Sequence, residues 1–531
     1  MFEKVLVKKP KRARFDFSHG NSLSMKFGLF TPTEVRFIVP GDDVSVSMEQ
    51  IVRVAPLPVP TFVNMKVRHD WFFVPLSMMY SQSAMDLLLG TQGSRNRARV
   101  ANMLAYTAKF ADVGNAIIPG SIHDHLGYPC LSDVNCPSGV YEDYLAYLDN
   151  PTATTYDDLF NVANASEFTV VAEDTGALTI EPLLAYHYIW RDFYRFTGIE
   201  VDAIQESWLE NHVFTDYFIS NPVDISAAIS NYIPLNYRHK GTSAGTESFS
   251  LYLGKPYYAH YKKDMFTSVR YGSKPTVLIP TGSSGTIPNL REASAIQRFI
   301  DLVAVTGQRY WDKVQGLFDE TPTGMRSERV QFLARYMSYI KVGEVITTAT
   351  TSEANTGDYA GRGLLVDGKY LFKRHFTEHG WLFCISSIVP ELHYAGLSRQ
   401  LTDINMLDTP IPSLAQVGDQ SVKKREMYFT YKAGSNDTVL GDQFRYYAYK
   451  SAPNEVHGDF LFKSFEPWTG LGFANSTAGN IIELSKVKPS YWNKVFTVFD
   501  DSEAFSGRFF LDLTFHEFIT RKLPKYMAYS L

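Results

Sequence analysis

The chain has 531 residues, 45% of them apolar, and a formal net charge of −5 at pH 7. This length suits roughly two to four domains, or one large all-β fold with long insertions, and the small net charge excludes a protein that binds polyanions over its whole surface. Three cysteines are too few for a disulfide framework and indicate a reducing compartment of origin. No apolar run approaches about 18 residues and no signal peptide is apparent, so we expect no membrane insertion.

The start of the chain is strongly basic. We predict that residues 1–14 form a flexible N-terminal arm whose positive charges contact nucleic-acid phosphate without reading bases. The nucleic-acid-binding residues are expected to be Lys8, Lys9, Lys11, Arg12 and Arg14. Phe15 and Phe17 follow at once and would anchor the chain where the arm ends. A solvated tail that only aids solubility, or a chance likeness to a nuclear signal, is the alternative.

Three strand-like segments come next. Residues 33–43 and 44–54 alternate polar and apolar side chains with a period of two, which predicts strands with one buried face. The face of the first segment that we expect to be buried carries Val35, Phe37 and Val39. Residues 64–75 form a longer strand-like run, and the three prolines of residues 55–62 fit an extended connector.

The middle of the chain has helical patterns. Apolar residues recur at helical spacing in 181–198, 290–318 and 327–343, and the first and last of these segments end at Gly198 and Gly343. The sequence therefore predicts helices between strands, without a regular alternation of strand and helix.

Two stretches, residues 108–180 and 236–289, are rich in glycine and polar residues and are predicted to be large insertions. Strand patterns return towards the end of the chain. Residues 380–392 are almost all apolar, as in a strand buried on both faces, and residues 507–520 alternate again. Strands at both chain ends, joined through long connections, are typical of a Greek-key or jelly-roll barrel. We therefore expect residues 15–531 to form one domain.

Several apparent catalytic motifs lack the surroundings that their chemistry needs. Gly241–Gly245 matches the spacing of a nucleophile elbow, but polar residues flank it where a strand and a helix are required. Gly363–Lys369 resembles part of a phosphate-binding loop, but Tyr370 stands where a magnesium-binding hydroxyl is needed. A hairpin turn at Asp367-Gly368 explains that segment better. We predict no catalytic residue.

The case for a metal or cofactor is equally weak. His123, His125, Cys130 and Cys136 are competent zinc ligands, but their spacing fits no standard zinc finger. Adjacent carboxylates at 157–158 and 500–501 splay apart on a strand and do not form a glycosidase pair by themselves. We expect no bound metal and no cofactor.

Five segments resemble the major capsid protein of the microviruses, which are small icosahedral bacteriophages with circular single-stranded DNA. They are "FDFSH" at 15–19, "VPGDDVSVSM" at 39–48, "VRVAPLPVP" at 52–60, "HDWFFVP" at 69–75 and "EHGWLFCISSIVPE" at 378–391. The segments occur in the order and at about the spacing of that family, and the resemblance covers roughly a third of the chain. The extra sequence between them resembles the gokushovirus-like members in length.

The resemblance implies a mainly β fold, an eight-stranded antiparallel jelly roll of the viral capsid type, with helices in long loop insertions. It also implies a homo-oligomer of about sixty copies, the simplest (T=1) icosahedral capsid. Further expected partners are packaged single-stranded DNA, a small basic internal protein, minor virion proteins and a host surface receptor met by outer loops. The protein would be made in the host bacterial cytoplasm and reside in the virion.

A jelly roll also serves carbohydrate-active enzymes and lectins, so a monomeric β-sandwich of that class is the alternative function. A host-receptor-binding protein is a third interpretation and overlaps with the first, because outer capsid loops can do that work. Particle size separates the classes: a shell sediments as a large closed particle and an enzyme as a 60 kDa monomer.

Overall fold

The computed structural model describes residues 12–80, 119–128, 181–195, 256–269, 329–346, 359–403, 405, 409–415, 419–431, 436–471, 485–496 and 507–523. The strands of the main sheet are β1 (Ala13–Asp16), β2 (His19–Met25), β3 (Thr31–Ile38), β4 (Asp43–Val54), β5 (Met65–Pro75), β6 (Gln331–Ile346), β7 (Tyr359–His375), β8 (Gly380–Pro390) and β11 (Phe509–Arg521). A second, two-stranded sheet pairs β9 (Asp419–Lys423) with β10 (Val439–Phe444).

The described helices are short. The α-helices are α2 (Ile122–His125), α7 (Glu181–Ile189), α14 (Arg399–Thr402), α15 (Lys424–Met427) and α17 (Pro489–Trp492). The π-helical turn η2 (Trp190–Tyr194) continues α7, and the 3₁₀ turns are η1 (Leu76–Met78), η3 (Pro412–Leu414), η4 (Tyr447–Tyr449), η5 (Gly458–Leu461), η6 (Lys463–Trp468) and η7 (Asn493–Val495). No helix in these ranges is long and apolar enough to cross a membrane.

The main sheet has the pairing of a rolled-up hairpin. The first strands pair with the last, β1 and β2 with β11; then β3 pairs with β8, β4 with β7 and β5 with β6, all antiparallel. The sheet contains nine strands, but β1 and β2 run in succession along one side of β11, so they fill a single edge position and leave eight. Nested pairing of eight antiparallel strands is the topology of a jelly roll.

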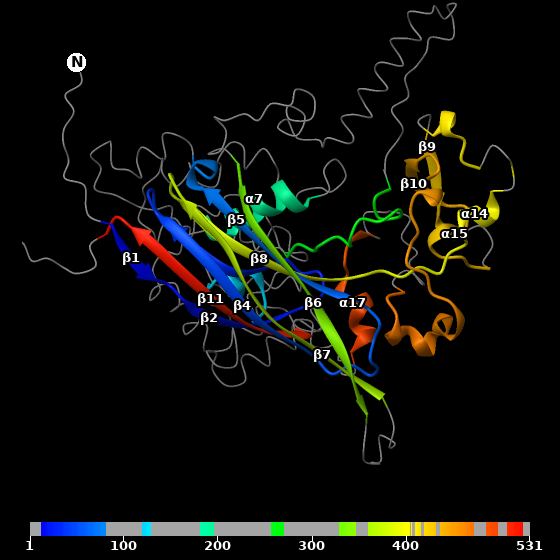
Figure 1. The fold of residues 1–531 in the computed structure, drawn as a ribbon, viewed down its shortest axis with the longest axis horizontal. Coiled ribbons are helices and arrows are strands. Elements are labelled where there is room, and N and C mark those ends of the chain that lie inside the picture. Colours follow the sequence, from blue (N-terminus) through cyan, green and yellow to red (C-terminus); the bar gives the residue numbers. More distant parts are fainter. Residues whose placement is uncertain are drawn as a thin grey trace, which may run out of the picture.

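β6 turns the corner between the two halves of this sheet. Its first part, Gln331 to Ile340, pairs with β5, and its second part, Lys341 to Ile346, pairs with β7. One layer therefore holds β3, β8, β5 and β6, and the other holds β6, β7, β4, β11 and the β1–β2 edge, in one curled body (Figure 1). The small β9–β10 sheet lies beside one end of it, together with α14 and α15 (Figure 1).

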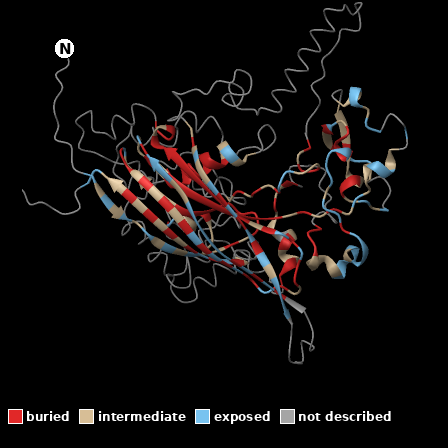
Figure 2. Cartoon of the chain, in the orientation of Figure 1, coloured by how far each residue is buried: buried red, intermediate tan, exposed pale blue. Residues whose placement is uncertain are grey.

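Every second side chain of β4 and β11 points inward, and these side chains form the inner face of one layer. The two strands pair without a break over twelve residues of each, from Phe509↔Val54 to Thr520↔Asp43. Their buried and more exposed side chains alternate, which gives the banded strands of Figure 2. Two inward positions are polar, Gln50 and Glu517, and each side chain is 1% exposed.

The other layer is covered on both faces. Most of β5 and β8 is buried, and α7 is buried along its whole length. The Tyr186 hydroxyl donates to the Phe30 carbonyl (2.8 Å), and Trp381 Nε1 donates to Glu181 Oε2 (2.8 Å), so α7 is held against the β3 end of this layer. The nearly unbroken apolar run of 380–392 reflects this burial on two sides.

Most strand predictions are confirmed. The segments 33–39, 44–54, 64–75, 380–390 and 507–518 all lie in this one sheet. The first and last segments lie close in space, because Arg36 Nε lies 3.4 Å from Glu517 Oε2. The predicted helix at 181–198 is present up to Tyr194.

The expected faces of β3 are wrong. Val35 and Phe37 are only half-buried, whereas Glu34 and Ile38 are buried. Glu34 points towards β2 and β11, where it forms ion pairs with His19 and Arg36. The first four residues of β3 are all buried, so the simple alternation expected from the sequence does not hold.

The helix predicted over 327–343 is also wrong, since β6 is a strand there. Tyr336, Ser338 and Ile340 are buried, while the intervening Met337 and Tyr339 are 47% and 50% exposed. The apolar positions fit a period of 3.6 and a period of two almost equally, and pairing on both sides by β5 and β7 selects the strand.

The hairpin turn predicted at Asp367-Gly368 does not exist either. β7 runs straight through it, with Asp367 opposite Gln50 and Gly368 opposite Glu49. A Cβ on Gly368 would lie 3.0 Å from Glu49 Cγ. Glycine at this position therefore allows the two strands to approach closely and does not form a turn. The predicted helix at 290–318 lies outside the described residues, as do nearly all of the insertions expected at 108–180 and 236–289.

Candidate nucleic-acid interface

The basic N-terminal segment joins the main sheet through β1. Pairing with β11 begins at Ala13, opposite Arg521, so the arm boundary expected at residue 14 falls inside a strand. Lys8, Lys9 and Lys11 lie outside the described residues. The backbone N–H and C=O groups along this edge of β11 need hydrogen-bond partners, and β1 supplies them from Ala13 onwards.

The two described arginines of the expected arm contact the protein itself. Arg12 NH1 donates to Asp43 Oδ2 (2.7 Å), and the Arg14 guanidinium lies 4.0 Å from the centre of the Phe518 ring. His375 also contacts Asp43 (2.6 Å). Arg12 and Arg14 therefore help to fix the root of the basic segment on the sheet.

Phe17 contributes to the same anchor. Its backbone N–H donates to the Glu517 carbonyl (2.8 Å), and its half-buried ring packs against the core. The guanidinium groups of Arg36 and Arg521 lie 5.1 and 5.8 Å from the ring centre. Phe15 is half-buried and pairs with Ile519.

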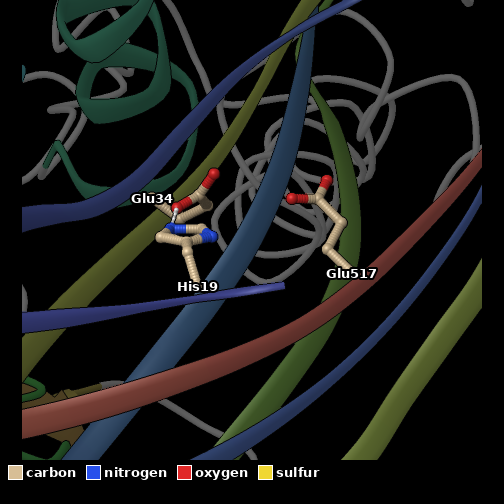
Figure 3. A group of neighbouring side chains, drawn as sticks. All are labelled: His19, Glu34 and Glu517. Atoms are coloured by element: carbon tan, nitrogen blue, oxygen red, sulfur yellow. Dashed lines mark ion pairs between the residues drawn. The ribbon is translucent and has the colours of Figure 1, made fainter. Parts of the chain in front are cut away.

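A charged cluster follows immediately, formed by His19 of β2, Glu34 of β3 and Glu517 of β11 (Figure 3). His19 Nε2 lies 2.7 Å from Glu34 Oε2, and Arg36 NH2 lies 2.9 Å from Glu34 Oε1. The cluster thus joins strands from both layers and from both ends of the chain. We call these four residues the edge cluster.

Hydrogen bonding shows that His19 is charged in the edge cluster. Its Nδ1 lies 2.9 Å from the Phe17 carbonyl oxygen, which can only accept, so Nδ1 carries a hydrogen. Its Nε2 faces a carboxylate, which also accepts, so Nε2 carries the second hydrogen. In agreement, the hydrogen bond to Glu34 raises the pKa of His19.

Glu517 is the least satisfied member. Arg36 Nε lies 3.4 Å from Glu517 Oε2, but neither Glu517 oxygen receives a well-formed hydrogen bond. Burial, and next the charge of Glu34, raise the pKa of Glu517 to about 7. An ionised carboxylate in this position costs free energy, so the cluster favours binding one more proton near neutral pH.

The edge cluster offers one nitrogen and two carboxylate oxygens within 4.8 Å of one another, a donor set that zinc accepts. The imidazolium and the Arg36 guanidinium already balance the two carboxylates. A divalent ion would have to displace the His19 proton and approach Arg36. The residues therefore fit a proton-linked clasp between strands better than a metal centre.

The other candidates from the sequence do not form a site in the described ranges. His123 and His125 lie on α2, whereas Cys130 and Cys136 lie outside these ranges. The same holds for Gly241–Gly245 and for both carboxylate pairs. Lys369 is exposed on β7 and belongs to no phosphate-binding loop.

Sequence reasoning missed the edge cluster. Glu517 stands in phase with Phe509, Leu511, Leu513 and Phe515 on the buried face of β11. An acidic residue in an apolar phase is a visible signal of a buried charge that needs a partner. Which residue supplies that partner is not visible, because Arg36 and His19 are remote in the sequence.

The nested pairing of eight strand positions defines a class of protein: a jelly-roll protein of the viral capsid type. A family model described as capsid protein (F protein) matches residues 4–528. The chain therefore belongs to the capsid protein (F protein) family.

Two relatives agree with this assignment. Capsid protein VP1 of Chlamydia phage 1 is 23% identical over 527 residues, which cover 87% of this chain and 86% of the relative. Capsid protein VP1 of Bdellovibrio phage phiMH2K is 22% identical over 525 residues, which cover 91% and 87%. The resemblance to microvirus capsid proteins is confirmed, the protein is a structural component of the virion, and the enzyme or lectin alternative is not supported.

Proposed function

We propose that about sixty copies of this chain form a closed T=1 icosahedral shell around a circular single-stranded DNA genome. The chain has no catalytic role in this proposal. A small basic internal protein, minor virion proteins and a host receptor are its further partners. Membership of a capsid protein family over nearly the whole chain supports the assembly.

The observation that carries the DNA contact is the root of the basic segment. A run with three lysines (Lys8, Lys9 and Lys11) leads directly into a strand that is paired with β11, packed through Phe17 and tied by the edge cluster. A charged segment can hold DNA against the shell only if the segment is itself firmly attached to the folded subunit. Phosphate contact needs charge but no fixed base-reading geometry, so the binding is independent of sequence.

The test separates the lysines from the arginines. Lys8, Lys9 and Lys11 are changed together to Ala, and DNA retention in purified particles is measured against salt concentration. We expect weaker retention at low salt, with the slope of log affinity against log salt reduced by roughly 0.7 for each phosphate that is no longer neutralised. Subunit stability stays nearly unchanged, because exposed charges contribute little to folding.

Arg12→Ala with Arg14→Ala is the comparison variant. Its main effect is expected on the anchoring of β1, since these side chains contact Asp43 and Phe518. Unchanged salt dependence in the triple lysine variant, or an outer location of the segment in an image of the particle, would disprove the DNA contact.

Separate experiments test the assembly into a shell and the absence of a catalytic role. Sedimentation of the purified protein as a monomer under all conditions would contradict the shell. Ser243→Ala and Lys369→Ala are expected to leave particle yield and infectivity unchanged. A loss of infectivity in correctly assembled particles carrying either change would contradict the non-catalytic role.

A further inference from the structure

A second concentration of positive charge lies far along the chain from the arm. A cavity of about 460 Å³ opens between β5, β6, η2 and residues 256–269. Six cationic side chains line it, and no aspartate or glutamate does: Lys66, Arg68, Arg195, Lys262, Lys263 and Arg335. We call this cavity the basic pocket.

One carboxylate beneath the pocket accounts for only part of this charge. Asp70 is fully buried and accepts from Arg335 Nε (2.5 Å) and from the Tyr194 hydroxyl (2.6 Å), and it pairs with Arg68 Nε (3.1 Å). Asp70 therefore orients two guanidinium groups at the wall of the cavity but neutralises only one charge. The arrangement is a built frame, not a chance gathering of surface lysines.

The charges at the pocket repel one another. Burial, followed by the charges of Arg68 and Lys262, lowers the pKa of Lys66, and the charge of Glu391 opposes this shift only in part. Lys262 and Lys263 are adjacent and exposed at the mouth. Like charges held this close disfavour the folded state, and an anionic ligand removes the penalty.

Aromatic rings complete the pocket. Phe30, Tyr194 and Tyr261 belong to its lining, and Arg68 lies 5.8 Å from the Phe30 ring centre and 5.4 Å from that of Tyr194. Phe193 also lines it and is 42% exposed, so its ring is available to a ligand. Cationic groups beside an exposed ring are the combination that binds single-stranded nucleic acid, through phosphate contacts and base stacking.

We propose that the basic pocket binds a nucleotide unit of single-stranded DNA, with phosphate on Lys262, Lys263 and the Arg68–Arg335 pair and a base stacked on Phe193. The volume suits a nucleotide unit and not a duplex. A simple inorganic anion would use the charge but not the exposed ring. This inference rests on the proposed enclosure of single-stranded DNA, yet it places the contact at a site separate from the basic arm.

The binding test uses purified full-length protein and a fluorescent oligothymidylate, with affinity measured across a range of salt. Lys262→Ala with Lys263→Ala is expected to weaken binding and to reduce the salt slope by roughly 1.4, for two phosphate contacts at about 0.7 each. Phe193→Ala is expected to weaken binding roughly 5-fold or more without a change in slope, because stacking carries no charge. Lys369→Ala with Lys373→Ala removes two exposed charges from β7 and serves as the matched control. It should weaken binding much less than the Lys262→Ala and Lys263→Ala pair, although both variants lose the same net charge.

A second measurement uses the assembled particle. Ultraviolet cross-linking of DNA-filled particles, followed by mass spectrometry, is expected to yield DNA adducts on peptides that contain residues 193–195 or 260–263. Adducts confined to other parts of the chain would overturn the inference. So would an affinity that responds equally to the pocket and control lysine pairs, or competition by inorganic phosphate alone with no effect of Phe193→Ala.

These results distinguish the pocket from the arm. If the triple lysine variant of the arm loses DNA and the pocket variants do not, the pocket inference fails and the proposed function stands. If neither set of variants affects binding and particles form without DNA, the proposed enclosure of DNA fails as well.

Discussion

Two buried polar groups on neighbouring strands of the same layer have opposite chemistry. Gln50 of β4 and Glu517 of β11 both face inward between apolar neighbours, and each meets a histidine-containing group. Around Gln50 the histidine is neutral, and Gln50 and His69 bond to uncharged groups, of which Ser338 donates in turn to the Asp367 carboxylate (2.8 Å); around Glu517 the histidine is charged. The partners decide the difference, since both sites are deeply buried.

The group around Gln50 crosses the whole sandwich. His69 Nε2 donates to Gln50 Oε1 (2.9 Å), and His69 Nδ1 accepts from Ser386 Oγ (2.7 Å). Ser386 contacts Thr33 Oγ1 (2.8 Å), and Gln50 continues to Ser338 (3.4 Å). Both ring nitrogens are satisfied without a charge, and burial lowers the pKa of His69 to about 4.

A histidine within a strand-rich core is charged or neutral according to the groups that face its two ring nitrogens. Amide and hydroxyl groups support a neutral ring with one donor and one acceptor. A carboxylate and a carbonyl, both acceptors, require two donors and hence an imidazolium. The first arrangement stabilises the centre of the sandwich at all but acid pH, and the second makes the edge sensitive to pH near neutrality.

The largest expected effect comes from breaking the central group. His69→Leu leaves Gln50 and Ser386 without their buried partner, so the free energy of unfolding is expected to fall by about 2–4 kcal/mol. Thermal or denaturant unfolding of the subunit measures it. His457→Leu, at a histidine side chain that is 80% exposed, is the control and should cost less than about 0.5 kcal/mol. Equal effects from both changes would show that the central hydrogen bonds contribute nothing.

The second largest effect is expected at Glu517, whose protonation makes stability depend on pH. Its pKa is about 7 when folded and 4.5 ordinarily, so the native state binds the extra proton and stability falls as pH rises from 4.5 through 7. Glu517→Gln should be nearly neutral at pH 5 and relatively more stable than wild type at pH 8, by about 3 kcal/mol at most. A stability difference that does not vary between pH 5 and 8 would contradict the unsatisfied carboxylate.

Acid pH should act on the central group with the opposite sign. The unfolded state binds protons on histidine below about 6.5, while the folded pKa is about 4 for His69 and, through burial, about 3 for His187. The stability that these two histidines contribute is therefore complete above pH 6.5 and is lost as the pH falls towards 4. We expect the stability advantage of wild type over His69→Gln to shrink as the pH falls from 6.5 towards 4, while His187 keeps its own contribution in both proteins. A difference between the two proteins that does not change over this range would show that His69 does not carry this pH dependence.

The smallest expected effect concerns zinc. Because Arg36 and protonated His19 already balance the two carboxylates of the edge cluster, added Zn²⁺ should shift the melting temperature of wild type and of His19→Gln by the same small amount. A shift in wild type that disappears in both His19→Gln and Glu517→Gln would make the edge cluster a metal site and overturn its interpretation as a clasp.

Much of this protein follows from local pattern. The alternation in 44–54 and 507–520 and the apolar run of 380–392 predicted three strands correctly, since a half-buried strand and a fully buried one impose different periods on the sequence. Five short motifs in order led to the capsid family. These signals are local, and each is complete within about a dozen residues.

Tertiary structure alone decided the rest. Residues 331–346 became a strand because β5 and β7 flank them, and Asp367-Gly368 stayed extended because β4 lies opposite. The edge cluster joins His19 to Glu517, from the two ends of the chain, and the basic pocket joins residues of β5 and β6 to η2 and 256–269. Charge and hydrogen-bond partners act over a few ångströms in space, and no period along the sequence records which remote residue will supply them.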